Sequence, residues 1–161
     1  ATAGGTGRGV SAAHARRRTL LMLYIDTSVL VAALTNESRT AEMQDWLATQ
    51  AAGDLVISDW VMTEFSTALS IKVRSGQLGP EHRAEALAVF RSIAELSLDV
   101  VAVSRMDFAA AARLSDQHRS GLRAGDALHL AIAANHGYRL VSLDRTLTQA
   151  GLELGVDARL L

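Results

Sequence analysis

Met22-Leu-Tyr-Ile-Asp-Thr-Ser-Val-Leu-Val-Ala-Ala-Leu34 is the stretch of sequence that decides the fold. Its apolar start predicts a buried strand, since Tyr24 and Ile25 both favour β structure. Asp26 ends the apolar run, and residues 29–34 then continue as an apolar helix rich in alanine and leucine. A buried strand that ends in a carboxylate and turns into a helix is typical of the carboxyl edge of a parallel sheet, where open α/β folds place their ligands. Taken alone, Asp26 can equally be a helix N-cap.

Composition limits the classes of protein to which the chain can belong. The chain has 161 residues, 49% of them apolar, which suffices for one domain with a core. The net charge is −1, so no global basic field indicates a nucleic-acid partner. There is no cysteine, which excludes disulfides, thiolate catalysis and zinc–sulfur sites. No apolar run reaches the roughly 20 residues of a membrane span, so we expect a cytoplasmic protein with no membrane partner.

Residues 1–21 differ in composition from the rest of the chain. They include a glycine-rich segment, residues 4–9, and the basic block Arg16-Arg17-Arg18. A signal peptide has an apolar core and a cleavage site after its charges, and this segment lacks both. The glycines spell a loose G-x-G with no strand before them, which is too weak a motif for nucleotide binding. We therefore expect residues 1–21 to be a flexible leader and residues 22–161 to form a single domain.

Strands and helices are expected to alternate along residues 22–161. Short apolar runs predict further strands at residues 55–57, 98–103, 140–143 and 156–160. Helical spacing and capping residues predict helices at residues 39–51, 60–75, 81–96, 105–118, 126–136 and 145–150. In the helix at 105–118, Phe108 is expected to face inward. This alternation predicts an α/β fold whose parallel sheet is covered by helices on both faces.

Two carboxylates lie in helices that are otherwise apolar. Glu64 shares one side of its helix with Trp60 and Ala68, where a carboxylate is costly unless a cation or donors satisfy it. A long side chain at the edge of such a stripe can also reach water. Asp126 lies in the first turn of an almost wholly apolar helix, where the positive end of the helix dipole favours an anion. Gly125 before it would allow a substrate or another backbone to approach closely.

Asp144 repeats the arrangement of Asp26. It follows an apolar strand and precedes a helix, and Ser142 lies on the same side of that strand. Each aspartate alone can be an N-cap, but three aspartates and one glutamate near strand ends can converge at one sheet edge. Such a cluster repels itself without metal, and its hard oxygen ligands suit Mg²⁺ or Mn²⁺. With metal bound, the site could activate water for attack on a phosphodiester.

The ordered set of motifs resembles PIN-domain ribonucleases, and most closely the VapC toxins of bacterial toxin–antitoxin pairs. The motifs are Tyr24-Ile-Asp-Thr-Ser-Val-Leu30, the helix-borne Glu64, Gly125-Asp-Ala-Leu-His-Leu-Ala131 and Ser142-Leu-Asp144. Each motif is weak singly, but the set extends over residues 22–161 in the order and spacing of the family. The resemblance implies a PIN-like three-layer fold, with a central parallel sheet of order 3-2-1-4-5 flanked by helices.

The resemblance also implies a function. It implies an endoribonuclease dependent on Mg²⁺ or Mn²⁺, the toxin of a type II toxin–antitoxin system, which cleaves cellular RNA by metal-activated water. The positions that match the catalytic and metal-binding acids are Asp26, Glu64, Asp126 and Asp144. Ser28 and Ser142 match the small polar positions beside those acids. The implied partners are an RNA substrate, a VapB-type antitoxin whose tail blocks the pocket, and a second copy of the chain in a homodimer.

Three other functions remain open from the sequence. One is a PIN-like RNA-processing nuclease outside a toxin–antitoxin pair. Another is a non-catalytic PIN-like binding module, which an incomplete acidic set would favour. The third is a haloacid-dehalogenase-like phosphatase, which also starts with a strand ending in Asp. That chemistry requires a second Asp two residues after Asp26, and Ser28 stands there instead.

Histidine and arginine side chains near the acids each have more than one role open to them. His129 lies one turn after Asp126, near enough for a hydrogen bond to it, but most such histidines are satisfied core residues. Because imidazole is a second choice for Mg²⁺, we do not expect His129 to be a ligand. Several arginines fall near the expected sheet edge and could contact RNA phosphates or form a solvated face: Arg119, Arg123, Arg139 and Arg145.

Overall fold

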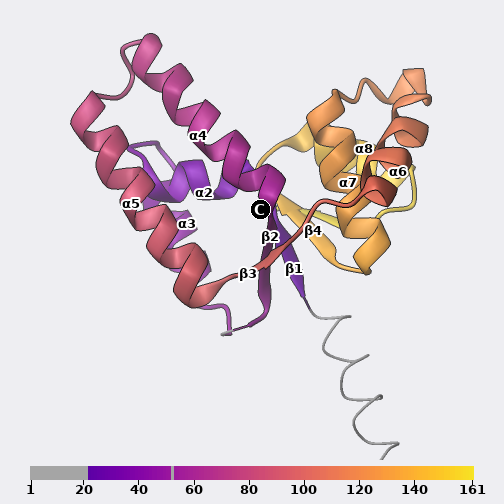
Figure 1. The fold of residues 1–161 in the computed structure, drawn as a ribbon, viewed down its shortest axis with the longest axis horizontal. Helices are drawn as coiled ribbons and strands as arrows, with labels where there is room; N and C mark the ends of the chain where they lie inside the picture. The colour runs from indigo at the N-terminus through magenta and orange to yellow at the C-terminus, as the bar shows by residue number, and fades with distance from the viewer. Residues whose placement is uncertain (1–21, 52) are drawn as a thin grey trace, which may run out of the picture.

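The structure is a computed structural model that describes residues 22–51 and 53–161 (Figure 1). The leader expected at residues 1–21 lies outside the described residues. The strands are β1 (Leu23–Ile25), β2 (Leu55–Ser58), β3 (Asp99–Val101), β4 (Arg139–Ser142) and β5 (Ala158–Leu160). The helices are α2 (Thr27–Leu34), α3 (Thr40–Ala48), α4 (Asp59–Arg74), α5 (Pro80–Ser97), α6 (Arg105–Ser115), the 3-10 turn η1 (His118–Ser120), α7 (Ala124–His136) and α8 (Arg145–Glu153).

The sheet confirms the expected strand order. All of its neighbouring strands pair in parallel, in the order β3-β2-β1-β4-β5. The chain adds β2 and β3 on one side of β1 and then returns to place β4 on the other side. Tyr24 pairs with Leu140 and Ile25 with Val141, so β1 and β4 end side by side. The order of the strands reverses here, which is where open α/β sheets have their ligand crevice.

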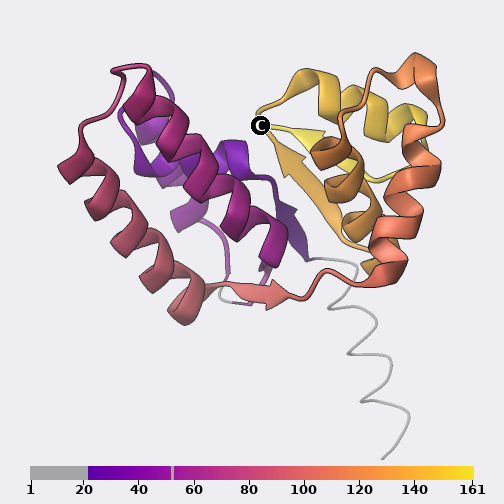
Figure 2. The same cartoon turned by 45° about the horizontal axis from the view of Figure 1, so that its top comes forward.

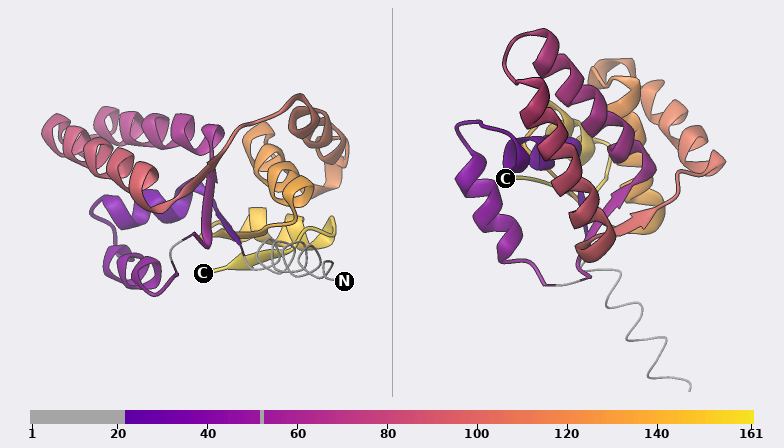
Figure 3. Two further views of the ribbon diagram at one scale, coloured as in Figure 1. Left: turned by 60° about the horizontal axis from the view of Figure 1, so that its bottom comes forward. Right: turned by 60° about the vertical axis from the view of Figure 1, so that its left-hand side comes forward.

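Two groups of helices enclose the sheet. Helices α2 to α5 gather on one side and α6 to α8 on the other (Figure 2), and the left-hand view of Figure 3 separates the same groups. The central strands have apolar side chains on both faces, as expected of a parallel sheet covered on both sides. Those that are fully buried in β1, β2 and β4 are Tyr24, Ile25, Val56, Ile57, Leu140 and Val141. The predicted three-layer α/β architecture is therefore correct.

Several element boundaries differ from the sequence prediction. Helix α2 begins at Thr27, directly after Asp26, because Asp26 itself caps the helix. Strand β3 is shorter than predicted, and α6 ends at Ser115, before the separate turn η1. Phe108 was expected to face inward but is 57% exposed. Asp107 takes the buried position instead, because its carboxylate folds back onto Ser104 in a capping box.

Among residues 22–51 and 53–161, no helix combines the length and the apolar character that crossing a bilayer requires.

Candidate functional site

Asp26 lies at the junction of β1 and α2 and is 6% exposed. Its Oδ2 accepts hydrogen bonds from Ser28 Oγ at 2.5 Å and Ser142 Oγ at 2.7 Å. The two serine oxygens in turn accept backbone N–H groups, Leu143 N at 3.0 Å onto Ser28 and Asp144 N at 2.8 Å onto Ser142. Since each serine oxygen accepts from an amide, its hydroxyl hydrogen is free to donate to Asp26. The two serines singled out in the sequence therefore both orient this carboxylate.

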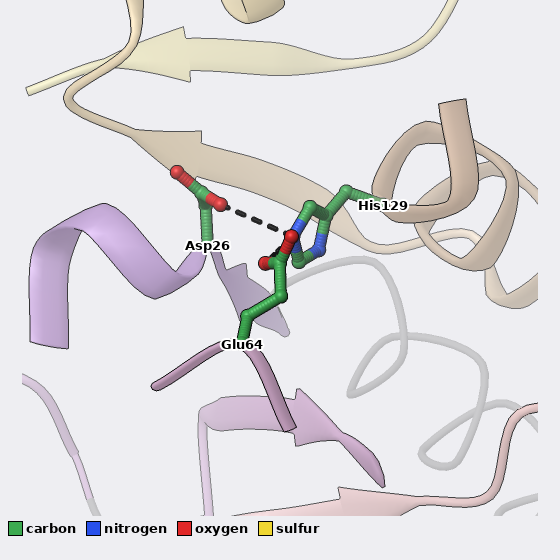
Figure 4. A group of neighbouring side chains, drawn as sticks. All are labelled: Asp26, Glu64 and His129. Atoms are coloured by element: carbon green, nitrogen blue, oxygen red, sulfur yellow. Dashed lines mark hydrogen bonds and ion pairs between the residues drawn. The ribbon is translucent and has the colours of Figure 1, made fainter. Parts of the chain in front are cut away.

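Glu64 reaches the same place from α4 (Figure 4). Its Oε2 accepts a hydrogen bond from Thr27 Oγ1 at 2.7 Å and lies 2.6 Å from His129 Nε2. Burial acts to raise the pKa of Glu64, but the hydrogen bonds to His129 and Thr27 and the charge of His129 outweigh it, so the pKa is lowered. Glu64 is thus held as a carboxylate at the site, with 28% of its side chain exposed.

His129 joins the two carboxylates (Figure 4). Its Nε2 lies 2.6 Å from Glu64 Oε2 and 3.3 Å from Asp26 Oδ1, and its ring is 1% exposed. Burial acts to lower the pKa of His129, but the hydrogen bond to Glu64 and the surrounding acidic charges raise it above its usual value. The expected hydrogen bond was to Asp126, yet the acids that the ring contacts are Glu64 and Asp26.

These three side chains form a group that could hold a metal ion. Asp26, Glu64 and His129 each offer a ligand atom, and the three atoms lie within 4.8 Å of one another. Two of these groups are oxygen donors, which suit Mg²⁺ or Mn²⁺. The sequence predicted the two carboxylates of the group, whereas it favoured a core role for the histidine.

Asp126 is half-buried in the first turn of α7, outside this tight group. Its Oδ2 accepts a hydrogen bond from the Arg123 backbone N–H at 3.1 Å. Burial raises the pKa of Asp126, and the negative charges of Asp144 and Asp26 raise it further against the opposing effects of Arg123 and His129. Asp126 is therefore repelled by the charges of Asp144 and Asp26, and a bound cation would reduce this repulsion.

Asp144 is exposed and caps α8, where its Oδ1 accepts a hydrogen bond from Leu147 N at 3.0 Å. The capping role considered from the sequence is therefore real. The residue also follows β4 directly, beside the serine that contacts Asp26, and its charge acts on Asp126. Asp144 thus has one oxygen bonded to the helix while its side chain stays at the carboxyl edge of the sheet.

Gly125 makes room for the Glu64 carboxylate. A Cβ atom at this position would lie 2.9 Å from Glu64 Oε1 and 3.3 Å from Trp60 Cζ2. A contact of 2.9 Å is too close for a real Cβ, so a side chain at residue 125 would displace Glu64. The sequence indicated a close approach at this glycine. The approaching groups in the structure are the side chains of Glu64 and Trp60.

Two hollows bear on the site, and one of them is lined by Glu64. The first is a largely apolar cavity of about 550 Å³ between α2 and α4, lined by Thr27, Ser28, Val31, Trp60, Glu64, Ala68, Ile71 and Leu143 among others. The second is a polar groove of about 290 Å³ that includes Arg119 from η1 and Arg145 from α8. Two of the four arginines considered for phosphate contact therefore line one groove.

Comparison with known proteins places the chain in a family. Residues 23–152 match the PIN domain family, and the chain therefore belongs to the PIN-domain family. A comparison with curated protein sequences finds no match.

Solved structures with a similar fold include VapC20 of Mycobacterium tuberculosis, described as a sarcin–ricin loop cleaving toxin. It is 20% identical with a TM-score of 0.64, over 80% of this chain and 95% of that chain. PAE2754 of Pyrobaculum aerophilum is 23% identical with a TM-score of 0.60, over 81% and 80%. VapBC2 of Rickettsia felis, bound to a DNA fragment from their promoter, is 17% identical with a TM-score of 0.59, over 86% and 98%. At these identities the likeness shows the fold.

Sequence reasoning missed two side chains that contact Glu64 or His129. Thr27 donates to Glu64, and the Tyr24 hydroxyl lies 3.0 Å from His129 Nδ1. One signal was present for Tyr24, because it lies two residues before Asp26 and side chains at that spacing share one face of a strand. For His129, the three-residue spacing from Asp126 places both on one side of α7, but this spacing does not reveal which other helix that side faces.

Proposed function

We propose that this chain is a metal-dependent endoribonuclease and the toxin of a type II toxin–antitoxin pair. The observation that carries the proposal is the meeting of Asp26 and Glu64, from the end of β1 and from α4, around His129 at the carboxyl edge of the sheet. We assign the catalytic and metal-binding roles to Asp26, Glu64, Asp126 and Asp144. Membership of the PIN-domain family supports this assignment.

The donor set fits Mg²⁺ or Mn²⁺. It is rich in carboxylate oxygens, which these ions prefer. Burial is the main cause of the raised pKa of Asp126, and the negative charges of Asp144 and Asp26 add a smaller contribution that a cation would offset. When bound, the metal would polarise a phosphate oxygen and lower the pKa of the attacking water. The protein's part is to fix its ligands: Ser28 and Ser142 orient Asp26.

RNA is the proposed substrate. The groove that includes Arg119 and Arg145 is polar, and the planar guanidinium group suits bidentate contact with phosphate. Contacts of this kind position the nucleic-acid backbone and carry no sequence information. The name of the structurally similar VapC20, a toxin that cleaves the sarcin–ricin loop, supports RNA as the substrate class.

We further propose a VapB-type antitoxin as partner, a homodimer as the assembled state and the cytoplasm as the location. The similarity to the toxin–antitoxin complex VapBC2 supports the antitoxin partner.

The test is RNA cleavage by the parent and by Asp126→Asn, with and without excess EDTA. We expect cleavage by the parent in Mg²⁺ or Mn²⁺, none in EDTA and none by the variant, which keeps the acceptor for Arg123 N but loses the charge. Asp45→Asn, an exposed change on α3, is the matched control and should cleave like the parent. Full activity of Asp126→Asn, or cleavage that EDTA leaves undiminished, would contradict the metal mechanism. RNA binding by the parent without cleavage would favour a binding module.

A further inference from the structure

A buried chain of hydrogen bonds leads from the sheet to the acids. Ser58 Oγ lies 2.7 Å from the Tyr24 hydroxyl, which lies 3.0 Å from His129 Nδ1. On the other side of the ring, His129 Nε2 lies 2.6 Å from Glu64 Oε2. This series of hydrogen bonds runs from Ser58 at the end of β2 to β1 and α7, and it ends at Glu64 on α4. Three of its residues, Ser58, Tyr24 and His129, have no assigned role in the metal site proposed above.

The inner part of this chain is closed to solvent. Ser58 and Tyr24 are 0% exposed and His129 is 1% exposed. A buried tyrosine hydroxyl needs partners, and here both partners are side chains on neighbouring elements. The contact of the Tyr24 hydroxyl with Nδ1 therefore fixes the orientation of the His129 ring.

The oxygen atoms around His129 Nε2 indicate which ring nitrogen carries a proton. Glu64 Oε2 already accepts a hydrogen bond from Thr27 Oγ1, and it lies 2.6 Å from His129 Nε2. Asp26 Oδ1 lies 3.3 Å from the same nitrogen, so Nε2 faces two oxygen acceptors that an unprotonated nitrogen would repel. Nε2 must therefore carry a hydrogen. A nitrogen that carries a hydrogen cannot also coordinate a metal, and Mg²⁺ prefers oxygen.

We propose that Ser58 and Tyr24 hold His129 with its Nε2–H directed at Glu64 and Asp26, so that His129 is a positioning residue for the two carboxylates. Its role in catalysis rests on the proposed function, because it acts by keeping those carboxylates turned toward the metal. Hydrogen-bond partners of metal ligands typically contribute about 10- to 100-fold to metal affinity or activity, and we expect an effect of this size here.

The first experiment compares the chain's two tyrosines, each of which lies next to a histidine. Tyr24→Phe removes the hydroxyl that contacts His129 and keeps the ring. Tyr138→Phe is the matched control, since Tyr138 stacks on His136 with ring centroids 5.2 Å apart, away from the acids. Titration calorimetry should show Mn²⁺ affinity weakened about 10- to 100-fold in Tyr24→Phe and unchanged in Tyr138→Phe. Parent-like affinity in Tyr24→Phe would overturn the proposal.

The second experiment observes the His129 ring directly and does not depend on the folding of any variant. Nitrogen-15 NMR of the parent should show a proton on Nε2, and that proton should persist at saturating Mg²⁺. Loss of the Nε2 proton when Mg²⁺ binds would make His129 a metal ligand and overturn the proposal. A ring protonated on Nδ1 alone would also overturn it.

A conservative replacement separates hydrogen bonding from packing. His129→Gln keeps a side-chain N–H that can reach Glu64, whereas His129→Leu fills similar space without a donor. We expect Mn²⁺ affinity closer to the parent in His129→Gln than in His129→Leu, and no further loss when Tyr24→Phe is added to His129→Gln. Equal affinities in the Gln and Leu variants would contradict the positioning role. If the parent cleaves no RNA but these results hold, the proposed function fails while the positioning role stands.

Discussion

Ser142 and Asp26 are joined by a hydrogen bond of 2.7 Å from Ser142 Oγ to Asp26 Oδ2. Ser142 is the last residue of β4, and Asp26 follows directly after β1. These are the neighbouring strands between which the order of the sheet reverses. The bond thus ties the most buried of the four acids to the topology of the sheet.

Replacing Ser142 by alanine should weaken both the fold and the site. Asp26 would lose one of its two hydroxyl donors, and the Asp144 amide would lose its acceptor. We expect a loss of about 1–3 kcal/mol in the free energy of unfolding, the usual effect of leaving buried polar groups without a partner. Urea unfolding measures the stability and Mn²⁺ calorimetry the site. Ser92→Ala, at an exposed position on α5, is the control. A Ser142→Ala protein that matches this control in both measurements would show that the bond contributes nothing.

Replacing Gly125 by alanine should damage the site more than the fold. The added Cβ would lie 2.9 Å from Glu64 Oε1, so the flexible Glu64 side chain must move. Alanine has the higher helix propensity, by up to about 1 kcal/mol, which should offset the steric cost in stability. We expect a nearly unchanged melting temperature together with slower RNA cleavage.

The control for this change is Gly79→Ala at the N-cap of α5. A Cβ there would lie 3.6 Å from His82 Nδ1, an ordinary contact. Cleavage by Gly125→Ala at the rate of Gly79→Ala would show that the position of Glu64 tolerates the added methyl group.

The general architecture could be predicted from the sequence because it depends on local patterns. Apolar runs and capping residues alternate clearly, which indicated a parallel sheet covered on both faces. An aspartate that follows a strand must lie at the carboxyl edge, so Asp26 and Asp144 could be placed there without knowledge of the packing. The order of the strands came from the resemblance to the PIN domain, and the structure confirms it.

The contacts of His129 could not be predicted in the same way. Its ring meets Glu64 because α4 and α7 both reach the end of β1, and helical periodicity does not reveal which helices are neighbours in space. Phe108 shows the same limit on a smaller scale. Its spacing suited an inward position, but Asp107 is the buried side chain, and its carboxylate accepts hydrogen bonds from Ser104 and Asn135.

Asp107 lies outside the candidate metal site, and it provides a prediction of how the stability of the fold depends on pH. Burial acts to raise the pKa of Asp107, but hydrogen bonds from Asn135 and Ser104 outweigh it and lower the pKa. A lowered pKa in the folded state gives stability that is present above the unfolded-state pKa, about 3.9 for Asp, and is lost as the pH falls through the folded-state value. Asp107→Asn should therefore lose about 0.5–2 kcal/mol at neutral pH, the usual effect of losing a cap, and less below about pH 3.9.

Urea unfolding of the parent and Asp107→Asn at neutral and acid pH measures this difference. Asp116→Asn, an exposed change at the end of α6, corrects for the general effect of removing one negative charge. A difference between parent and Asp107→Asn that stays constant across the pH range would mean that the charge of Asp107 does not stabilise the fold.

Anomalous diffraction from crystals soaked in Mn²⁺ would test whether the acids at the carboxyl edge of the sheet hold a divalent metal. We expect an anomalous peak within coordination distance, roughly 2.0–2.6 Å, of the carboxylate oxygens of Asp26 and at least one of Glu64, Asp126 and Asp144. A Mn²⁺ concentration that supports RNA cleavage but gives no peak at these carboxylates, or gives one only elsewhere on the protein, would contradict it.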